Sequence, residues 1–174
     1  MTDLIVALDY NELHDVRSLI KTLGDSVRFY KVGLRLFTAQ HKAAIQAVTE
    51  SGAKVFLDLK FHDIPQTVGQ AVEECSRLGV YSCSLHLTGG RDMLKAAAHA
   101  KHRMKLWGIS VLTSLSADDL AASGLHRPKT LVPELARIGI ACGIDGVVCS
   151  GEESESLAAL TLRPQIIVPG VRPA

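Results

Sequence analysis

FLDLKFHD, residues 56–63, reads as a buried strand that nonetheless carries an acid, a base and a second acid. Because side chains alternate between the two faces of a strand, Asp58 and Lys60 share one face. Leu57 and Leu59 share the opposite face, where covering helices would bury them. We therefore expect the two charged side chains to lie side by side, within reach of a salt bridge.

Short apolar runs rich in β-branched residues recur along the chain and predict seven strands. They cover residues 4–9, 27–32, 54–59, 81–87, 106–112, 146–150 and 165–170. Helical periodicity is found between them, at residues 12–23, 36–51, 65–78, 92–102, 130–142 and 152–160. Strands that alternate with helices pair in parallel. Seven βα-like units fit a (β/α) barrel better than a six-stranded doubly wound sheet, and no GxGxxG motif follows the first strand. No linker rich in Gly, Ser or Pro divides the chain. We therefore expect a single α/β domain over residues 1–174, a (β/α)8 TIM barrel with about seven βα units.

The unusual polar residues follow the carboxyl ends of these predicted strands, where barrels place their chemistry. They are Asp9, Lys31, Asp58, Lys60, Asp63, Thr113, Ser114, Ser150 and Arg172. Charges at the ends of apolar strands are costly unless they are paired. The pattern therefore predicts a charged site at one end of the barrel.

Each of these charges also has a purely structural interpretation. Asp58 and Lys60 can form a buried ion pair that neutralises itself, and Lys31 can be a lysine whose stem lies along apolar surface. Asp63 precedes Ile64 and Pro65 and can cap a helix. The joint pattern, with alternating charges from different strands, favours a catalytic network.

Composition and charge argue against several kinds of partner. The net charge of +1 does not point to nucleic acid, and no apolar run approaches the roughly 20 residues of a membrane span. The first residues predict a strand rather than a signal peptide. No cysteine or carboxylate cluster suggests a metal site. The cysteines form no CxxC pair, which predicts reduced thiols in the cytoplasm; they are Cys75, Cys83, Cys142 and Cys149.

Six motifs together resemble the orotidine 5'-phosphate decarboxylase family of the bacterial type. They are IVALDY (5–10), YKVG (30–33), DLKFHDIPQTV (58–68), VLTS (111–114), DGVVCS (145–150) and PGVRP (169–173), in order over the whole chain. The DxKxxD core alone also occurs in related phosphate-binding barrels, whereas DLKFHDIP is highly specific. The resemblance implies decarboxylation of orotidine 5'-monophosphate to uridine 5'-monophosphate in de novo pyrimidine biosynthesis, without metal or organic cofactor.

The resemblance also implies a catalytic array of alternating charge, formed by Lys31, Asp58, Lys60 and Asp63. Lys60 would donate a proton to C6 of the pyrimidine. Asp58 would lie against the departing carboxylate, and Lys31 would position the array and the ribose.

Further residues are implied in substrate binding and in a homodimer. Asp63 and Thr67 would reach across the dimer interface into the partner's site. Asp9 would hydrogen-bond the ribose, Thr113 would lie near the pyrimidine, and Arg172 would contact the phosphate.

The chain stops at Ala174, whereas the resemblance implies several dozen further residues. These would carry a phosphate-gripping loop, an eighth strand, a helix and a Gly-Arg pair. We expect an incomplete copy with weakened decarboxylase activity; the alternative is a seven-stranded form with a gap between the first and seventh strands. Two other functions stay open: a Mg²⁺-dependent sugar-phosphate decarboxylase or aldolase of the same superfamily, and a non-catalytic truncated remnant that binds nucleotides.

Overall fold

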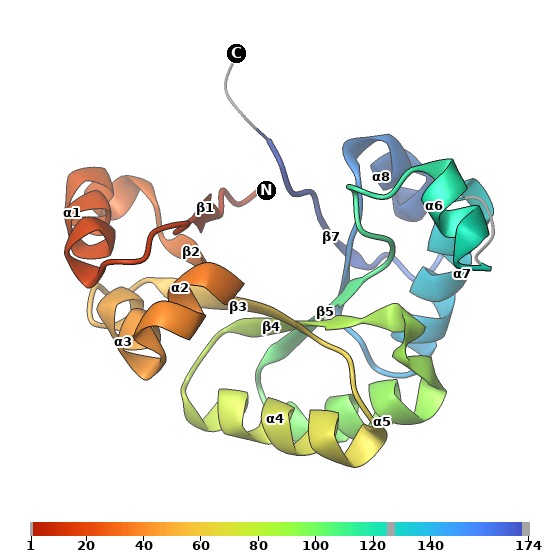
Figure 1. Ribbon diagram of the computed structural model, residues 1–174, viewed down its shortest axis with the longest axis horizontal. Helices are drawn as coiled ribbons and strands as arrows, with labels where there is room; N and C mark the ends of the chain where they lie inside the picture. The colour runs from red at the N-terminus through yellow and green to blue at the C-terminus, as the bar shows by residue number, and fades with distance from the viewer. Residues whose placement is uncertain (1, 125–127, 172–174) are drawn as a thin grey trace.

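The computed structural model describes residues 2–124 and 128–171. Among these residues, seven strands form one parallel sheet in the order of the sequence. The strands are β1 (Val6–Ala7), β2 (Phe29–Gly33), β3 (Lys54–Phe61), β4 (Ser82–His86), β5 (Lys105–Ile109), β6 (Gly146–Val148) and β7 (Gln165–Ile167). The sheet curls, with β1 and β7 as its two edges (Figure 1). The predicted barrel-type fold with about seven βα units is confirmed.

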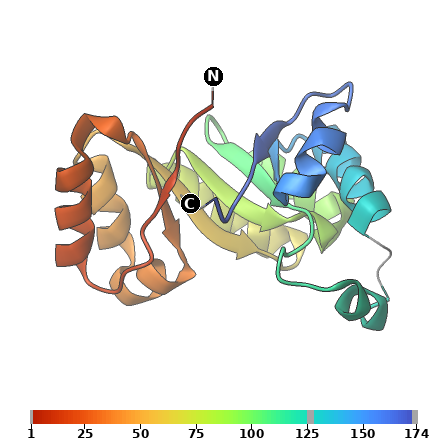
Figure 2. The same ribbon diagram turned by 90° about the horizontal axis from the view of Figure 1, so that it is seen from above.

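Helices cover the outer side of the curled sheet (Figures 1 and 2). They are α1 (Leu13–Leu23), α2 (Leu34–Gln40), α3 (Lys42–Thr49), α4 (Pro65–Arg77), α5 (Gly90–Ala100), α7 (Pro128–Ala141) and α8 (Gly151–Ala158). The short helix α6 (Ala117–Ala122) instead lies in the connection after β5 and projects away from the sheet (Figure 2). Two 3₁₀ turns, η1 (Gly24–Ser26) and η2 (Leu87–Gly89), complete the connections. These helices bury the outer face of the sheet, as its continuous apolar strands require.

Two local predictions are wrong. The single helix expected over residues 36–51 is divided into α2 and α3 at His41, whose φ of 49° lies in the left-handed region. The sequence there contains no glycine or proline that would have marked the break. The strand expected over residues 106–112 ends at Ile109, and a short helix, α6, follows; its capping box of Ser116 and Asp119 was a usable signal.

The apolar residues form two layers on either side of the sheet. The larger layer packs between strands and helices and contains Leu57. The smaller layer fills the inside of the curl with Phe29, Phe56 and Trp107. The ring centroid of Trp107 lies 4.5 Å from that of Phe56 and 5.7 Å from that of Phe29. Trp107 Nε1 donates a hydrogen bond to Gln165 Oε1 at 3.1 Å. This layer closes the interior below the carboxyl ends of the strands.

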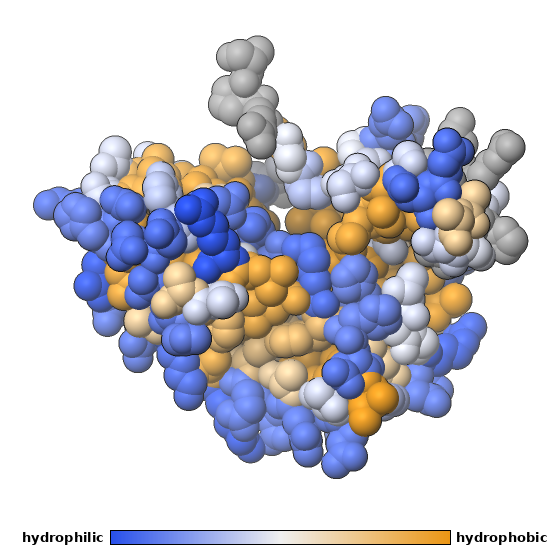
Figure 3. All heavy atoms as spheres, in the orientation of Figure 1, coloured by the Kyte–Doolittle hydropathy of each residue, from blue (hydrophilic) through white to orange (hydrophobic). Residues whose placement is uncertain are grey.

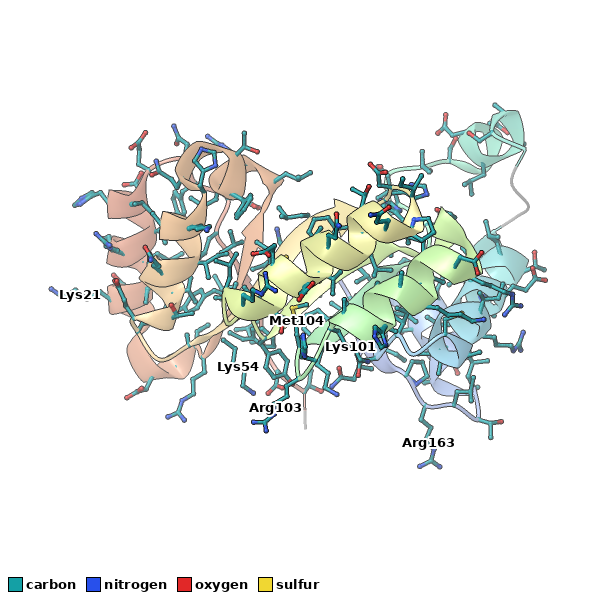
Figure 4. The ribbon with its side chains drawn as sticks, turned by 90° about the horizontal axis from the view of Figure 1, so that it is seen from below. Lys21, Lys54, Lys101, Arg103, Met104 and Arg163 are labelled. Atoms are coloured by element: carbon teal, nitrogen blue, oxygen red, sulfur yellow. The ribbon has the colours of Figure 1, made fainter. Side chains whose placement is uncertain are left out.

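At the amino ends of the strands, the carboxylate of Asp145, just before β6, connects the end of α5 with β5. It accepts hydrogen bonds from Lys101 Nζ at 2.7 Å, Lys105 Nζ at 3.0 Å and the backbone N–H of Leu106 at 3.0 Å. Figure 4 labels Lys101 and Lys54 at this end of the molecule. Burial raises the pKa of Asp145, but these hydrogen bonds lower it by more, so its pKa lies below the ordinary value.

Replacing Asp145 with asparagine should therefore destabilise the fold in a pH-dependent way. Asparagine keeps the shape and an acceptor but removes the charge, so the free energy of unfolding should fall by about 1–3 kcal/mol at neutral pH. Because the folded pKa is depressed, the stabilisation is present above the ordinary aspartate pKa of about 3.9 and is lost as the pH falls through the folded value. Urea unfolding of both proteins should show the difference shrinking towards about pH 3.

Asp3→Asn, which removes the same charge from an exposed position, serves as the control. An Asp145→Asn penalty that is equal at both pH values would show that the charge of Asp145 does not contribute to stability.

Candidate active site

Three neighbouring elements bring charged residues together at the carboxyl ends of β1, β2 and β3. Lys60 Nζ lies 2.8 Å from Asp58 Oδ2, and Lys31 Nζ lies 3.7 Å from the same oxygen. Lys31 Nζ also lies 3.6 Å from Asp9 Oδ1. The four side chains form a continuous chain of alternating charge, and the expectation that Asp58 and Lys60 lie side by side is confirmed.

The array runs from a buried carboxylate to an open surface. The side chain of Asp58 is 10% exposed, whereas those of Lys60 and Lys31 are 31% and 25% exposed and that of Asp9 is 69% exposed. A buried carboxylate is stable only when it is paired. The two partly exposed ammonium groups provide that pairing and remain reachable from solvent.

The position of Lys31 depends on the glycine two residues later. A Cβ atom built on Gly33 would lie 2.9 Å from Lys31 Nζ and 3.9 Å from Asp9 Oδ1. Gly33 pairs with Asp58 in the parallel register of β2 and β3, so this absent side chain leaves the space in which the lysine amine sits. The glycine of YKVG is therefore part of the site.

Strand β3 is irregular where it carries Lys60. Leu57 pairs with Cys83 and Phe61 with Leu85, so four residues of β3 advance against two of β4. Lys60 has a φ of 54°, a left-handed conformation that costs a non-glycine residue about 1–3 kcal/mol. Strain of this kind persists only where the surroundings fix it.

Ser84 on β4 supplies that fixation. Its Oγ accepts a hydrogen bond from the backbone N–H of Lys60 at 2.9 Å and donates one to Asp58 Oδ1 at 2.8 Å. This serine was not among the site residues predicted from the sequence. A signal was present, because Ser82, Ser84 and His86 place polar groups at alternate positions of an otherwise apolar strand.

Two histidines lie beside the array. The rings of His62 and His86 have centroids 5.3 Å apart. Burial lowers the pKa of His86, and electrostatic interaction with His62 and Lys60 lowers it further, against the opposing effect of Asp58. His86 is therefore a neutral neighbour of the array at neutral pH.

The remaining predicted residues stand apart from the array. Asp63 is exposed, its Oδ1 accepts the N–H of Ile64 at 2.7 Å, and within the described chain it forms no ion pair with either lysine. Thr67 is exposed in the first turn of α4, and Thr113 is exposed in the loop after β5. Arg172 lies outside the described residues.

Residues 2–124 and 128–171 contain no group of three or more His, Cys, Asp or Glu that could hold a metal ion. None of the described helices has the length and apolar character needed to cross a bilayer. Each of the four cysteines is a buried free thiol.

A (β/α)-type barrel with a charged lysine–aspartate array at the carboxyl ends of its strands belongs to the class of barrel enzymes, which place their chemistry at that end. Within this class, the chain belongs to the orotidine 5'-phosphate decarboxylase / HUMPS family, whose model matches residues 2–174. The family resemblance drawn from the sequence motifs is thereby confirmed.

Curated relatives and solved structures agree with this assignment. An orotidine 5'-phosphate decarboxylase of Opitutus terrae is 40% identical over 98% of this chain and 77% of its own length. One from Neisseria gonorrhoeae is 39% identical over 98% of this chain and 72% of its own length. The crystal structure of the Lactobacillus acidophilus orotidine 5'-phosphate decarboxylase matches with a TM-score of 0.90 and 33% identity, covering 99% of this chain and 82% of that one.

Gly33→Ala should displace the amine of Lys31 while leaving the fold intact. The new Cβ would meet the flexible end of a side chain, so the melting temperature should change by less than about 4 °C. Displaced from its two carboxylates, the amine should react faster with acetic anhydride, as measured by mass spectrometry of the Lys31 peptide.

Gly69→Ala is the matched control, because its Cβ would make only ordinary contact with Ala96 at 3.6 Å. If Gly33→Ala left the Lys31 acylation rate unchanged, the space above Gly33 would not be what places the amine.

Proposed function

We propose that this chain converts orotidine 5'-monophosphate to uridine 5'-monophosphate and CO2, a step of pyrimidine biosynthesis, in the cytoplasm. The carrying observation is the contact of 2.8 Å between Lys60 Nζ and Asp58 Oδ2, with a second ammonium, that of Lys31, at 3.7 Å from the same oxygen. Family membership and the names of the curated relatives support the same reaction.

The proposed chemistry uses one proton and no cofactor. The bond between C6 and the carboxylate breaks heterolytically, CO2 leaves, and the electron pair stays on C6 in the plane of the ring. The ammonium of Lys60 then gives its proton to C6, and solvent returns a proton to the amine. Asp58 keeps its charge throughout, because Lys31 and Ser84 continue to hold it.

Electrostatics of the transition state must supply most of the rate. A decarboxylation that leaves an unstabilised anion needs about 20 kcal/mol of help or more. Repulsion between Asp58 and the substrate carboxylate contributes about 4 kcal/mol at 4 Å with an effective dielectric constant near 20. The larger share must come from the ammonium groups facing C6 in a site closed to water, and from binding energy of the rest of the nucleotide.

The nucleotide's other groups are assigned by the same proposal. Asp9, 3.6 Å from Lys31 Nζ, would accept a hydrogen bond from the ribose. Thr113, exposed in the loop after β5, would lie near the pyrimidine. Arg172, outside the described residues, would contact the phosphate.

We further propose that two copies of the chain complete each other's sites, with Asp63 and Thr67 reaching into the partner. Large apolar side chains are exposed after the carboxyl ends of several strands, namely Leu34, Ile64, Leu112, Leu115 and Val168. Figure 3 shows several hydrophobic patches on the visible face, with hydrophilic residues between and around them. An open depression of about 490 Å³ lies beside Asp63 and is lined by His62, Asp63, Ile64, Pro65, Thr88 and Gly89. A second copy would cover these apolar groups.

The direct test is turnover of orotidine 5'-monophosphate by the wild-type chain and by Lys60→Ala. Loss of the proton donor should lower kcat by at least about 10³-fold, since a positioned acid and its charge are both removed. Release of CO2 and loss of orotate absorbance measure the rate. Lys54→Ala, at the opposite end of the same strand, should keep wild-type activity.

The same assay with EDTA separates this proposal from the Mg²⁺-dependent sugar-phosphate enzymes. Those enzymes are expected to place an acidic metal ligand at the end of the second strand, where this chain has the ammonium of Lys31, which repels a cation. Activity should survive EDTA. A wild-type chain without CO2 release, or with release that EDTA abolishes, would refute the proposed reaction.

Complementation tests the shared site. Asp63→Ala and Lys60→Ala chains should each be nearly inactive alone. In a mixed dimer, the Lys60→Ala chain supplies Asp63 to the intact lysine of its partner, so a refolded equimolar mixture should recover about a quarter of wild-type activity.

Lys60→Ala mixed with Asp58→Asn is the control, because both changes lie in the array of one chain and no intact site can form. Equal recovery in both mixtures, or none with Asp63→Ala, would rule out a contribution of Asp63 across an interface.

A further inference from the structure

Ser84 is the most tightly enclosed polar group of the site. It is 0% exposed, lies in the middle of β4, and forms its two hydrogen bonds with different parts of β3. One partner is the carboxylate of Asp58, at 2.8 Å, and the other is the backbone N–H of Lys60, at 2.9 Å. A single hydroxyl therefore joins the two residues that the reaction uses most directly.

The irregular register of β3 explains why a side chain makes this link. Regular parallel pairing would bond the N–H of Lys60 to a carbonyl of β4, but four residues of β3 lie against two of β4 there. The left-handed turn of Lys60 takes its N–H out of the ladder, and the Oγ of Ser84 accepts it instead. In an ideal strand, the Cα atoms of Asp58 and Lys60 would be about 6.6 Å apart along the strand. With the left-handed turn at Lys60, its Nζ lies 2.8 Å from Asp58 Oδ2.

The hydroxyl proton of Ser84 has only one direction available. A serine hydroxyl has one hydrogen to donate, and the N–H of Lys60 already occupies the acceptor side. The hydrogen therefore points at Asp58 Oδ1, which leaves Oδ2 for the two ammonium groups of Lys60 and Lys31. The carboxylate cannot rotate without breaking one of these contacts.

We propose that Ser84 is a positioning residue, whose hydroxyl holds the Asp58 carboxylate and the turned backbone of Lys60 together and so fixes where the Lys60 ammonium meets C6 of the substrate. The expected effect of Ser84 on kcat rests on the proposed decarboxylation. The expected effect on the position of the Lys60 backbone rests on the two hydrogen bonds alone.

Ser82 provides a matched comparison on the same strand. It lies two residues earlier, on the same face as Ser84, and is also 0% exposed. Its Oγ finds no hydrogen-bond partner among the described residues. The two serines differ in what their hydroxyls bond, so Ser82→Ala controls for loss of a buried hydroxyl from β4.

The first measurement is steady-state turnover of orotidine 5'-monophosphate by Ser84→Ala, Ser84→Thr and Ser82→Ala. Misplacement of a reacting group by about 1 Å can cost about 100-fold, so kcat of Ser84→Ala should fall about 10- to 100-fold. Its KM should change less than about threefold, because Ser84 is 0% exposed and its hydroxyl is already bonded on both sides to β3. Ser84→Thr keeps the hydroxyl and should recover most of kcat, and Ser82→Ala should match the wild type.

The second measurement, backbone amide exchange at Lys60, does not depend on activity. In Ser84→Ala the amide loses its acceptor and should exchange at least about tenfold faster, whereas Ser82→Ala should leave it protected. Unchanged exchange in Ser84→Ala would overturn the proposal, and so would wild-type kcat in that variant. An inactive wild-type chain would refute the proposed reaction, and the exchange result would then decide the role of Ser84 on its own.

Discussion

The carboxylate of Asp58 is the interaction on which the rest of the site depends. Two ammonium groups lie within 4 Å of one of its oxygens, at 2.8 and 3.7 Å, and a serine hydroxyl bonds the other. Without this charge, Lys31 and Lys60 would face each other with no counter-ion between them, and their repulsion would drive them towards solvent. The carboxylate in turn tolerates its burial only because these donors surround it.

The fold supplies the neighbours that this carboxylate needs. Parallel pairing of β2, β3 and β4 places Lys31, Asp58 and Ser84 on three adjacent strands, so no loop has to be ordered to bring them together. Below them, the rings of Phe56 and Trp107 fill the interior and keep the charged layer at the carboxyl ends. Rigid strands over an aromatic layer are a suitable support for a site whose contacts must be exact within an ångström.

The sequence predicted those parts of the site that follow from local rules. Alternation along one strand placed Asp58 beside Lys60, and the position of Lys31 at a strand end followed from parallel pairing. Ser84 and the left-handed Lys60 depend on a register shift between two strands, which no single segment encodes. The break at His41 was likewise invisible, because a left-handed residue without glycine is held by its surroundings rather than by propensity.

Charge balance links the exposure of Lys60 to turnover. The array contains two lysines and two aspartates, Asp9 and Asp58, so it is neutral before the substrate arrives. When Lys60 gives its proton to C6, Asp58 loses its closest counter-charge and keeps only Lys31 and Ser84. The buried carboxylate then lacks its closest counter-ion until the amine is charged again. The side chain of Lys60 is 31% exposed, so water can return that proton once the nucleotide leaves. The contact with Asp58 that positions the amine therefore also favours its return to the ammonium form after each turnover.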